Sequence, residues 1–340
     1  MFTSVDDLEE HLTRPSESLV ADLAAGSGDL VVLGAGGKMG PTLCRLARRG
    51  LDAAGRGADR VFAVSRWSDR AAAGALAGHG VDVVPFDLLD GDLGTLPDAA
   101  DVVFMVGAKF GTSAAPYLAW VVNAALPARV AERYGGARVA ALSTGNVYPL
   151  VPLSSGGSVE GDPVGPVGEY AMSCLGRERV FEHAAATRGT AVTIVRLNYA
   201  VDLRYGVLAD IGQRVLSGAP VDVTTGHVNV VWQGYANEVV LRSLAHATAG
   251  TPFTLNLTGP ETASVRRVAA AFGARLGTPV SFEGSEAGTA LLNDATLCHR
   301  LFGYPHVPLG TLVDWQADWL TAGLPTSGKP TKFAVRDGRF

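Results

Sequence analysis

A glycine-rich segment, Gly34-Ala35-Gly36-Gly37-Lys38-Met39-Gly40, follows an apolar run at residues 30–33 and precedes a helical pattern with Pro41 in its first turn. Small residues in such a segment let the backbone turn tightly, and they bring main-chain N–H groups and a helix N-terminus against a pyrophosphate. A tight turn without a ligand is the alternative, but strand, turn and helix occur in the required order. The sequence therefore predicts a dinucleotide site that includes Gly34, Gly37, Lys38, Met39 and Gly40.

The second strand-like run, at residues 60–64, ends in Ser65-Arg66 rather than in an acidic residue. NAD-specific sites place Asp or Glu there to hold the ribose diol, whereas hydroxyl and guanidinium donors suit a 2′-phosphate. The predicted cofactor is therefore NADP(H), with NAD(H) as the alternative and a solvated surface role open for Arg66. In Asp87-Leu88, after the third run, Asp87 either hydrogen-bonds an adenine amino group or caps a turn.

Three further polar features lie later in the chain. Asn123 falls in a crossover segment, Ser143-Thr144-Gly145-Asn146-Val147-Tyr148 follows the fifth strand-like run, and Tyr170 opens the next helical segment. With the glycine-rich turn and Asp87, they make the sequence resemble the extended short-chain dehydrogenase/reductase superfamily, in its NAD(P)-dependent epimerase/dehydratase group. The resemblance covers about residues 29–320.

The resemblance implies roles for individual side chains. It implies that Thr144 polarises the substrate oxygen and that Tyr170 is the acid/base. It also implies that Leu197 and Asn198, after the sixth strand-like run, flank the nicotinamide.

The family motif Tyr-x-x-x-Lys is broken, because this chain reads Tyr170-Ala171-Met172-Ser173-Cys174. A spacing of four places Cys174 one helical turn after Tyr170, where the family's lysine ammonium holds the nicotinamide ribose and lowers the pKa of the tyrosine. A thiol supplies no fixed positive charge. Lys109, in Gly107-Ala108-Lys109 after the fourth run, lies at the sheet edge where ligands bind in such folds. It is either a substitute cation or, as is commoner, a surface lysine. The cofactor is expected to border Gly107, Ala108 and Lys109.

Strand-like and helical runs alternate along the chain. The strand-like runs are short and apolar, as expected for strands buried on both faces of a parallel sheet, and they cover residues 29–33, 60–64, 81–85, 101–106, 138–142 and 191–197. Segments between them are rich in Ala, Leu, Arg and Glu and predict crossover helices, such as 42–49, 115–134 and 170–188. The predicted fold is α/β, a doubly wound parallel sheet of the Rossmann type.

Four segments are expected from this pattern. Residues 1–28 form a helical lead-in broken at Pro15, and residues 29–200 form the dinucleotide-binding domain. The pattern loosens over residues 201–326, which form mostly a smaller substrate lobe with segments that return to the first domain. The tail, 327–340, has no periodicity and is either disordered or laid over the surface.

The composition favours a small-molecule partner. The 340-residue chain has a net charge of −5 and no basic helix face, which argues against nucleic acid or an anionic membrane as the main partner. Three distant cysteines and scattered histidines suggest neither a disulfide framework nor a metal site. An acidic N-terminus without an apolar signal core predicts a cytoplasmic protein.

Two functions from different classes fit these residues. One is an NADP(H)-dependent oxidoreductase or epimerase that acts on a sugar-like hydroxyl or carbonyl substrate by hydride transfer. The other is a dinucleotide-binding regulatory or scaffolding protein with little or no catalysis. Thr144 and Tyr170 favour the enzyme, and Cys174 favours the binding protein. The family resemblance further implies a homodimer paired through the helices at 115–134 and 170–188.

Overall fold

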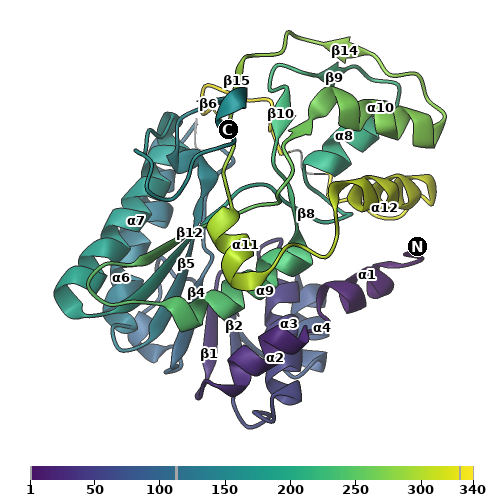
Figure 1. Cartoon of the computed structure of the whole chain (residues 1–340). Helices are drawn as coiled ribbons and strands as arrows, with labels where there is room; N and C mark the ends of the chain where they lie inside the picture. The colour runs from purple at the N-terminus through teal and green to yellow at the C-terminus, as the bar shows by residue number, and fades with distance from the viewer. Residues whose placement is uncertain (1, 112–113, 329–330, 340) are drawn as a thin grey trace.

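The computed structural model describes residues 2–111, 114–328 and 331–339. Its centre is a seven-stranded sheet in the order β12-β7-β5-β4-β1-β2-β3, with all neighbouring strands parallel (Figure 1). Most of its strand residues are buried on both faces, which confirms the predicted doubly wound fold. The strands are β1 (Leu30–Leu33), β2 (Val61–Ser65), β3 (Asp82–Pro85), β4 (Asp101–Phe104), β5 (Arg138–Thr144), β7 (Ala191–Leu197) and β12 (Phe253–Leu257).

Helices cover both faces of this sheet. One face packs against α2 (Glu17–Ala24), α3 (Gly40–Ala53), α4 (Arg70–Gly78), α9 (Gln233–Ser243) and α11 (Thr296–Phe302). The other face packs against η1 (Leu93–Thr95), α6 (Leu126–Arg133) and α7 (Gly168–Arg188). Three further 3₁₀ turns are η3 (Gly145–Val147), η4 (Leu153–Ser155) and η5 (Leu244–His246).

The crossover predicted as one helix at 115–134 is interrupted. It consists of α5 (Pro116–Trp120), a π-helical segment η2 (Val121–Ala125) and α6. Pro127 has no N–H, so it cannot donate to the carbonyl oxygen of Asn123 four residues earlier. Arg177 on α7 donates to that oxygen instead, from Nε at 3.4 Å. The irregular turn therefore presents Asn123 to the neighbouring helix, as π-helical turns at functional sites often do.

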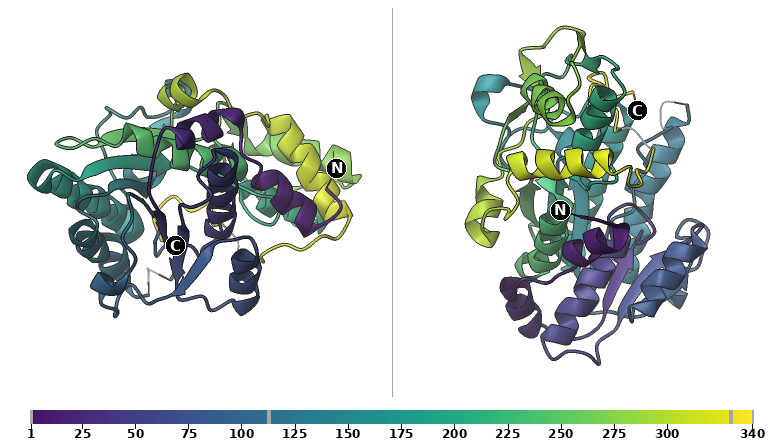
Figure 2. Two further views of the ribbon diagram at one scale, coloured as in Figure 1. Left: turned by 90° about the horizontal axis from the view of Figure 1, so that it is seen from below. Right: turned by 90° about the vertical axis from the view of Figure 1, so that its right-hand side faces the viewer.

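A second apolar cluster lies apart from the sheet and from α6 and α7 (Figures 1 and 2). It is built by α1 (Val5–Leu12), α8 (Val207–Leu216), α10 (Val265–Leu276) and α12 (Leu309–Thr321). Short strand pairs border it or join it to the sheet: β8 (Ala200–Val201) with β11 (Val231–Trp232), β9 (Val221–Asp222) with β14 (Phe282–Glu283), β10 (His227–Val228) with β13 (Ala263–Ser264), and β6 (Val151–Pro152) with β15 (Thr289–Ala290). No helix in the described part of the chain is long and apolar enough to cross a membrane.

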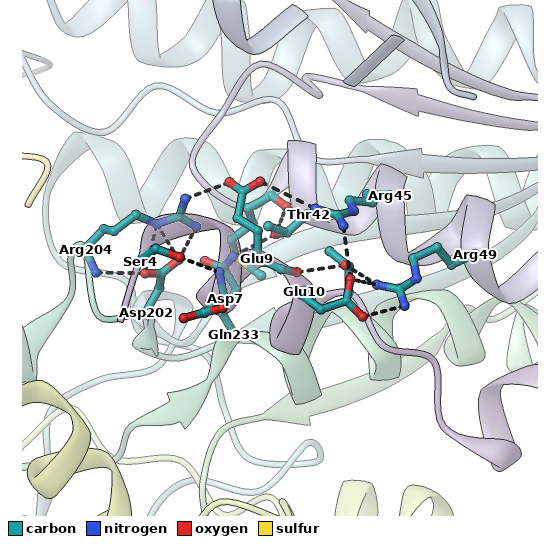
Figure 3. A network of polar contacts seen from close by, with 12 residues as sticks. Ser4, Asp7, Glu9, Glu10, Thr42, Arg45, Arg49, Asp202, Arg204 and Gln233 are labelled. Atoms are coloured by element: carbon teal, nitrogen blue, oxygen red, sulfur yellow. Dashed lines mark hydrogen bonds and ion pairs between the residues drawn. The ribbon is translucent and has the colours of Figure 1, made fainter. Parts of the chain in front are cut away.

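The carboxylates of the lead-in helix α1 pair with arginines of α3 and with Arg204, which follows β8 (Figure 3). Glu10 accepts hydrogen bonds from both terminal nitrogens of Arg49 at 2.7 and 2.8 Å, and pairs with Arg45 at 3.2 Å. Glu9 pairs with Arg204, which follows β8, at 2.8 Å. Both Arg45 and Arg49 belong to α3. The lead-in therefore fixes the second cluster against the helix that follows the glycine-rich turn.

The described residues of the tail, 327–328 and 331–339, lie against the rest of the protein, which is the alternative of a tail laid over the surface. Phe333 is buried in the second cluster. Arg336 donates to the carbonyl oxygen and the hydroxyl of Thr289 on β15, at 2.7 and 2.6 Å. Thr331 donates to Asp210 from its backbone N–H and its hydroxyl, at 2.7 and 2.6 Å. The described part of the tail accordingly reaches β15 through Arg336 (Figure 1).

Candidate active site

A cavity of about 310 Å³ lies where the carboxyl ends of β1, β4, β5 and β7 meet. The strand order reverses between β1 and β4, and such a reversal is where open α/β sheets bind ligands. The cavity lies between the sheet edge, the second cluster and the tail. Its walls include these residues expected from the sequence: Lys38, Met39, Lys109, Thr144, Tyr170, Leu197 and Asn198.

The glycine-rich turn is as tight as a phosphate-binding turn requires. Gly34 has φ of +89°, in the left-handed region that favours glycine. A Cβ on Gly36 would lie 2.6 Å from the hydroxyl oxygen of Ser65, and a Cβ on Gly40 would collide with the carbonyl oxygen of Ala35. No side chain caps the N-terminus of α3. These features fit a pyrophosphate, since the N–H groups at this end remain for an anion.

The end of β2 carries no acidic side chain. Ser65 is half-buried beside Gly36, and Arg66 is exposed, with no hydrogen bond or ion pair to any residue that the structure describes. Asp87 accepts a hydrogen bond from the backbone N–H of Leu89 at 2.9 Å, so it caps a turn. Leu88 beside it is buried. The position after β2 therefore offers a hydroxyl and a guanidinium group.

Asn123 fixes the loop after β4, which contains Gly107, Ala108 and Lys109. Its side chain accepts from the backbone N–H of Ala108 and donates to the carbonyl oxygen of Ala108, both at 2.9 Å. It also donates to Ser173 on α7 at 3.0 Å. The side chain is fully buried. The direction of the loop at Lys109 is thus set by a residue of the π-helical segment.

Thr144 and Tyr170 meet in the cavity. Thr144 ends β5, and its hydroxyl accepts from the backbone N–H of Asn146 at 3.2 Å. Burial raises the pKa of Tyr170 well above its usual value, and the neighbouring Cys174 raises it further. The Arg177 charge and a hydrogen bond with Thr144 oppose that shift in the pKa of Tyr170. Tyr170 is therefore protonated at neutral pH.

Cys174 lies one turn after Tyr170 on α7 and is almost fully buried, packed with Val147 and Tyr148. Burial raises the pKa of its thiol. Such a protonated, enclosed thiol is a poor nucleophile. It places no positive charge beside Tyr170.

Lys109 is half-buried and lines the cavity, which is the placement that a substitute cation requires. Its Nζ lies 5.5 Å from the centroid of the Tyr170 ring. Burial lowers the pKa of Lys109 to about 8, and the charges of Lys38 and Lys332 lower it too, while Cys174 opposes them. The physical reason for this placement is the Asn123 contact, which turns the loop into the cavity.

Tyr205 and Thr331 border the cavity but were not found by motif. Lys38 reaches across the cavity, with its Nζ 4.4 Å from the centroid of the Tyr205 ring. The Tyr205 hydroxyl donates a hydrogen bond to the side chain of Gln233. The Gln233 amide in turn donates to the hydroxyl of Thr42, at the start of α3, at 2.8 Å (Figure 3). Thr331 of the tail also borders the cavity. Neither Tyr205 nor Thr331 belongs to a motif, so only the folded chain brings them to the cavity.

The model of the NAD dependent epimerase/dehydratase family matches residues 30–203, from β1 to the turn after β8. The chain therefore belongs to this family, in agreement with its fold and with the resemblance noted in the sequence. No curated protein matches the sequence. Among the described residues there is no group of three or more His, Cys, Asp or Glu side chains placed to hold a metal ion.

Solved structures of low sequence identity share the fold. A dTDP-glucose 4,6-dehydratase from Streptomyces venezuelae, solved with NAD, is 20% identical with a TM-score of 0.73, covering 86% of this chain and 97% of its own. A UDP-glucuronic acid 4-epimerase variant from Bacillus cereus, solved with NAD and a fluorinated UDP-sugar, is 16% identical with a TM-score of 0.72, covering 86% and 99%. MoeE5, solved with UDP-glucose and NAD, is 19% identical with a TM-score of 0.70, covering 87% and 99%.

Proposed function

We propose that this protein is a nicotinamide-dependent oxidoreductase or epimerase that acts on a sugar-like substrate. The supporting observation is that Thr144 and Tyr170 line one cavity together with Lys38 of the glycine-rich turn and with Asn198. The turn and the N-terminus of α3 would hold the dinucleotide, which supplies a hydride acceptor or donor when bound. Because the similar structures were solved with nucleotide sugars, the proposed substrate class is a nucleotide sugar.

The two side chains would divide the work on the substrate oxygen. The Thr144 hydroxyl would donate a hydrogen bond to it, and the Tyr170 hydroxyl would pass a proton to it or receive one from it. The raised pKa of Tyr170 keeps its proton in place at neutral pH. That state favours protonation of a carbonyl over abstraction of a proton from an alcohol.

Turnover of UDP- and dTDP-sugars with NADP(H) and NAD(H) tests this assignment. Tyr170→Phe is expected to lower kcat by about 10²- to 10⁴-fold while cofactor binding persists. Tyr304→Phe is the matched control, since Tyr304 is an exposed tyrosine outside the cavity. Full turnover in Tyr170→Phe would place the acid/base elsewhere and refute the mechanism.

We further propose that the cofactor is NADP(H). The support is the end of β2, where Arg66 is exposed and has no hydrogen bond or ion pair with a described residue that would prevent it from pairing with a 2′-phosphate. The similar solved structures contain NAD, so the preference rests on Ser65 and Arg66 alone. Calorimetric titration should give tighter binding of NADPH than NADH. Arg66→Ala should weaken NADPH by about 1 to 3 kcal/mol, and Arg70→Ala, an exposed arginine at the start of α4, should not.

Cys174 supports a second candidate function, dinucleotide binding with little or no turnover. Position 174 would then correspond to the family's lysine, and its loss would leave no cation one helical turn after Tyr170 on α7. Tight NADPH binding by a protein that converts no carbonyl or sugar substrate would favour this function.

A further inference from the structure

We propose that Lys109 supplies, from the loop after β4, the positive charge that position 174 lacks, and that it is the positioning residue for the proton of Tyr170. The inference rests on the proposed function of Tyr170 as acid/base. It assigns to Lys109, in the loop after β4, the electrostatic role that the family motif gives to a lysine on the helix of Tyr170.

The geometry carries this assignment. The Lys109 Nζ lies 5.5 Å from the Tyr170 ring centroid and 5.8 Å from the Phe110 ring centroid, and Lys109, Tyr170 and Phe110 all line the cavity. An ammonium at about this distance is attracted by the ring. The ammonium therefore lies beside the phenol ring, and a charge within about 4–6 Å of an ionising group shifts its pKa.

Lys109 also reaches position 174 electrostatically. Its charge lowers the pKa of the Cys174 thiol, against the larger effect of burial, and the thiol in turn favours the charged form of Lys109. Lys109 therefore contacts the Tyr170 ring and also acts electrostatically on Cys174. The Asn123 clamp on Ala108 holds this placement.

Arg177 is the rival cation, since its charge lowers the pKa of Tyr170. Its guanidinium donates to the carbonyl oxygen of Leu142 at 2.5 Å and to the side chain of Asn123 at 2.9 Å. These bonds hold Arg177 between β5 and η2. Lys109, unlike Arg177, lines the cavity.

The charge state of Lys109 suits the task. With a pKa of about 8, set first by burial and then by Cys174, Lys38 and Lys332, the ammonium is mostly charged at pH 7. The proton of Tyr170 then leaves beside a positive charge during substrate oxidation. Above pH 8 the Lys109 ammonium loses its charge, and it no longer stabilises the phenolate of Tyr170. Lys109 and Tyr170 consequently titrate as a coupled pair, and an apparent pKa read from a pH profile belongs to the pair and not to either residue.

A direct test measures the phenol at position 170 in the absence of substrate. A fluorinated tyrosine acidic enough to ionise while Lys109 is still charged is incorporated at position 170, and its pKa is followed by ¹⁹F NMR. Lys109→Met should raise this pKa by about 1 to 3 units, and Lys109→Arg should largely restore it. An unchanged pKa in a folded Lys109→Met protein, as judged by circular dichroism, overturns the inference. If Lys109→Met does not fold, Lys109→Gln serves for the same measurement.

A second test uses turnover and moves the charge back to the helix. In the oxidative direction kcat/KM should rise with pH and level off near pH 8 in the natural protein. In Lys109→Met it should continue to rise to and beyond the ordinary tyrosine pKa of about 10, because burial raises the pKa of Tyr170. The double variant Lys109→Met, Cys174→Lys should recover the lower apparent pKa. A Lys109→Met profile that matches the natural one overturns the inference.

The two tests separate this inference from the proposed function. If the natural protein converts no substrate but Lys109→Met still raises the pKa of the phenol at position 170, the proposed function fails and the link between Lys109 and Tyr170 stands. If turnover depends on Tyr170 but not on Lys109, the proposed function stands and the inference fails.

Discussion

Gly338 of the tail packs against Gly168 of α7, two residues before Tyr170, more closely than any side chain would allow. A Cβ on Gly168 would lie 2.6 Å from the carbonyl oxygen of Gly338, and a Cβ on Gly338 would collide with the carbonyl oxygen of Val167. Both glycines have positive φ, +82° and +75°. The tail thereby joins Asn146 and Tyr148 in the wall of a second, smaller cavity beside the candidate site.

Gly338→Ala should displace the tail from the start of α7. The added methyl group and the left-handed φ together cost about 1 to 3 kcal/mol, so kcat/KM is expected to fall about tenfold as the wall loosens. Gly328→Ala is the control, because Gly328 also has a positive φ but no atom within 4 Å of an added Cβ. Equal losses in the two variants would mean that backbone strain alone acts.

Lys109→Met should stabilise the protein at neutral pH although it impairs the proposed reaction. The folded-state pKa of Lys109 is lowered to about 8, below the value of about 10.4 for an unfolded lysine. Between these values the unfolded chain binds more protons, so the free energy of unfolding rises with pH. Below pH 8 the buried ammonium costs stability in full, and above about pH 10.4 the cost is gone.

Urea unfolding at pH 7 and pH 10 measures this effect. At pH 7 Lys109→Met should raise the free energy of unfolding by about 1 to 3 kcal/mol, and most of that gain should vanish at pH 10. Arg70→Met, at an exposed position, should change little at either pH. If Lys109→Met has a lower free energy of unfolding than the natural protein at pH 7, the Lys109 ammonium does not destabilise the folded state and the prediction is wrong.

Much of the sheet could be predicted from the sequence because its strands are buried on both faces. The predicted run at 191–197 coincides with β7. The two-residue strands have no periodicity, so nothing local marks them. Helix α9 is buried over most of its length and lacks the polar face that identifies a surface helix.

The candidate site was only partly accessible from the sequence. The glycine-rich turn, Thr144 and Tyr170 follow strands in a known order, so motif and spacing found them. The contact between Lys38 and Tyr205 joins residues far apart in the chain and arises only from folding. The inward course of the loop at Lys109 depends on Asn123 and on the irregular helix around it, which periodicity cannot show.

An apolar patch on α5, η2 and α7 predicts a homodimer through the crossover helices. Its exposed side chains are Tyr117 (67% exposed), Leu118, Trp120, Val121 and Met172. Light scattering should give twice the 35.2 kDa monomer mass. Leu118→Arg should produce monomers by burying a charge in the interface, while Leu216→Arg, equally exposed on α8, should leave the mass unchanged. A monomer mass for the natural protein at micromolar concentration would contradict the prediction.

A buried ion pair lies directly behind Thr144. Arg196 on β7 contacts Glu178 on α7 at 2.8 Å, with both side chains almost fully buried. Ser143 donates to the Glu178 carboxylate, and Arg196 donates to the Tyr148 hydroxyl at 2.6 Å. The pair thus joins α7, β7 and the end of β5.

Arg196→Met should cost about 3 to 5 kcal/mol of stability, because it leaves the Glu178 carboxylate buried without its counter-charge. The matched control is Arg179→Met, which breaks an exposed pair between Arg179 and Glu182 and should cost at most about 1 kcal/mol. The free energy of unfolding of both variants is measured by urea titration at pH 7. The Arg196→Met deficit should shrink at acid pH, where Glu178 can take up a proton in the folded variant. A deficit of less than 1 kcal/mol for Arg196→Met at pH 7 would mean that water or a neighbouring donor satisfies Glu178 in its absence.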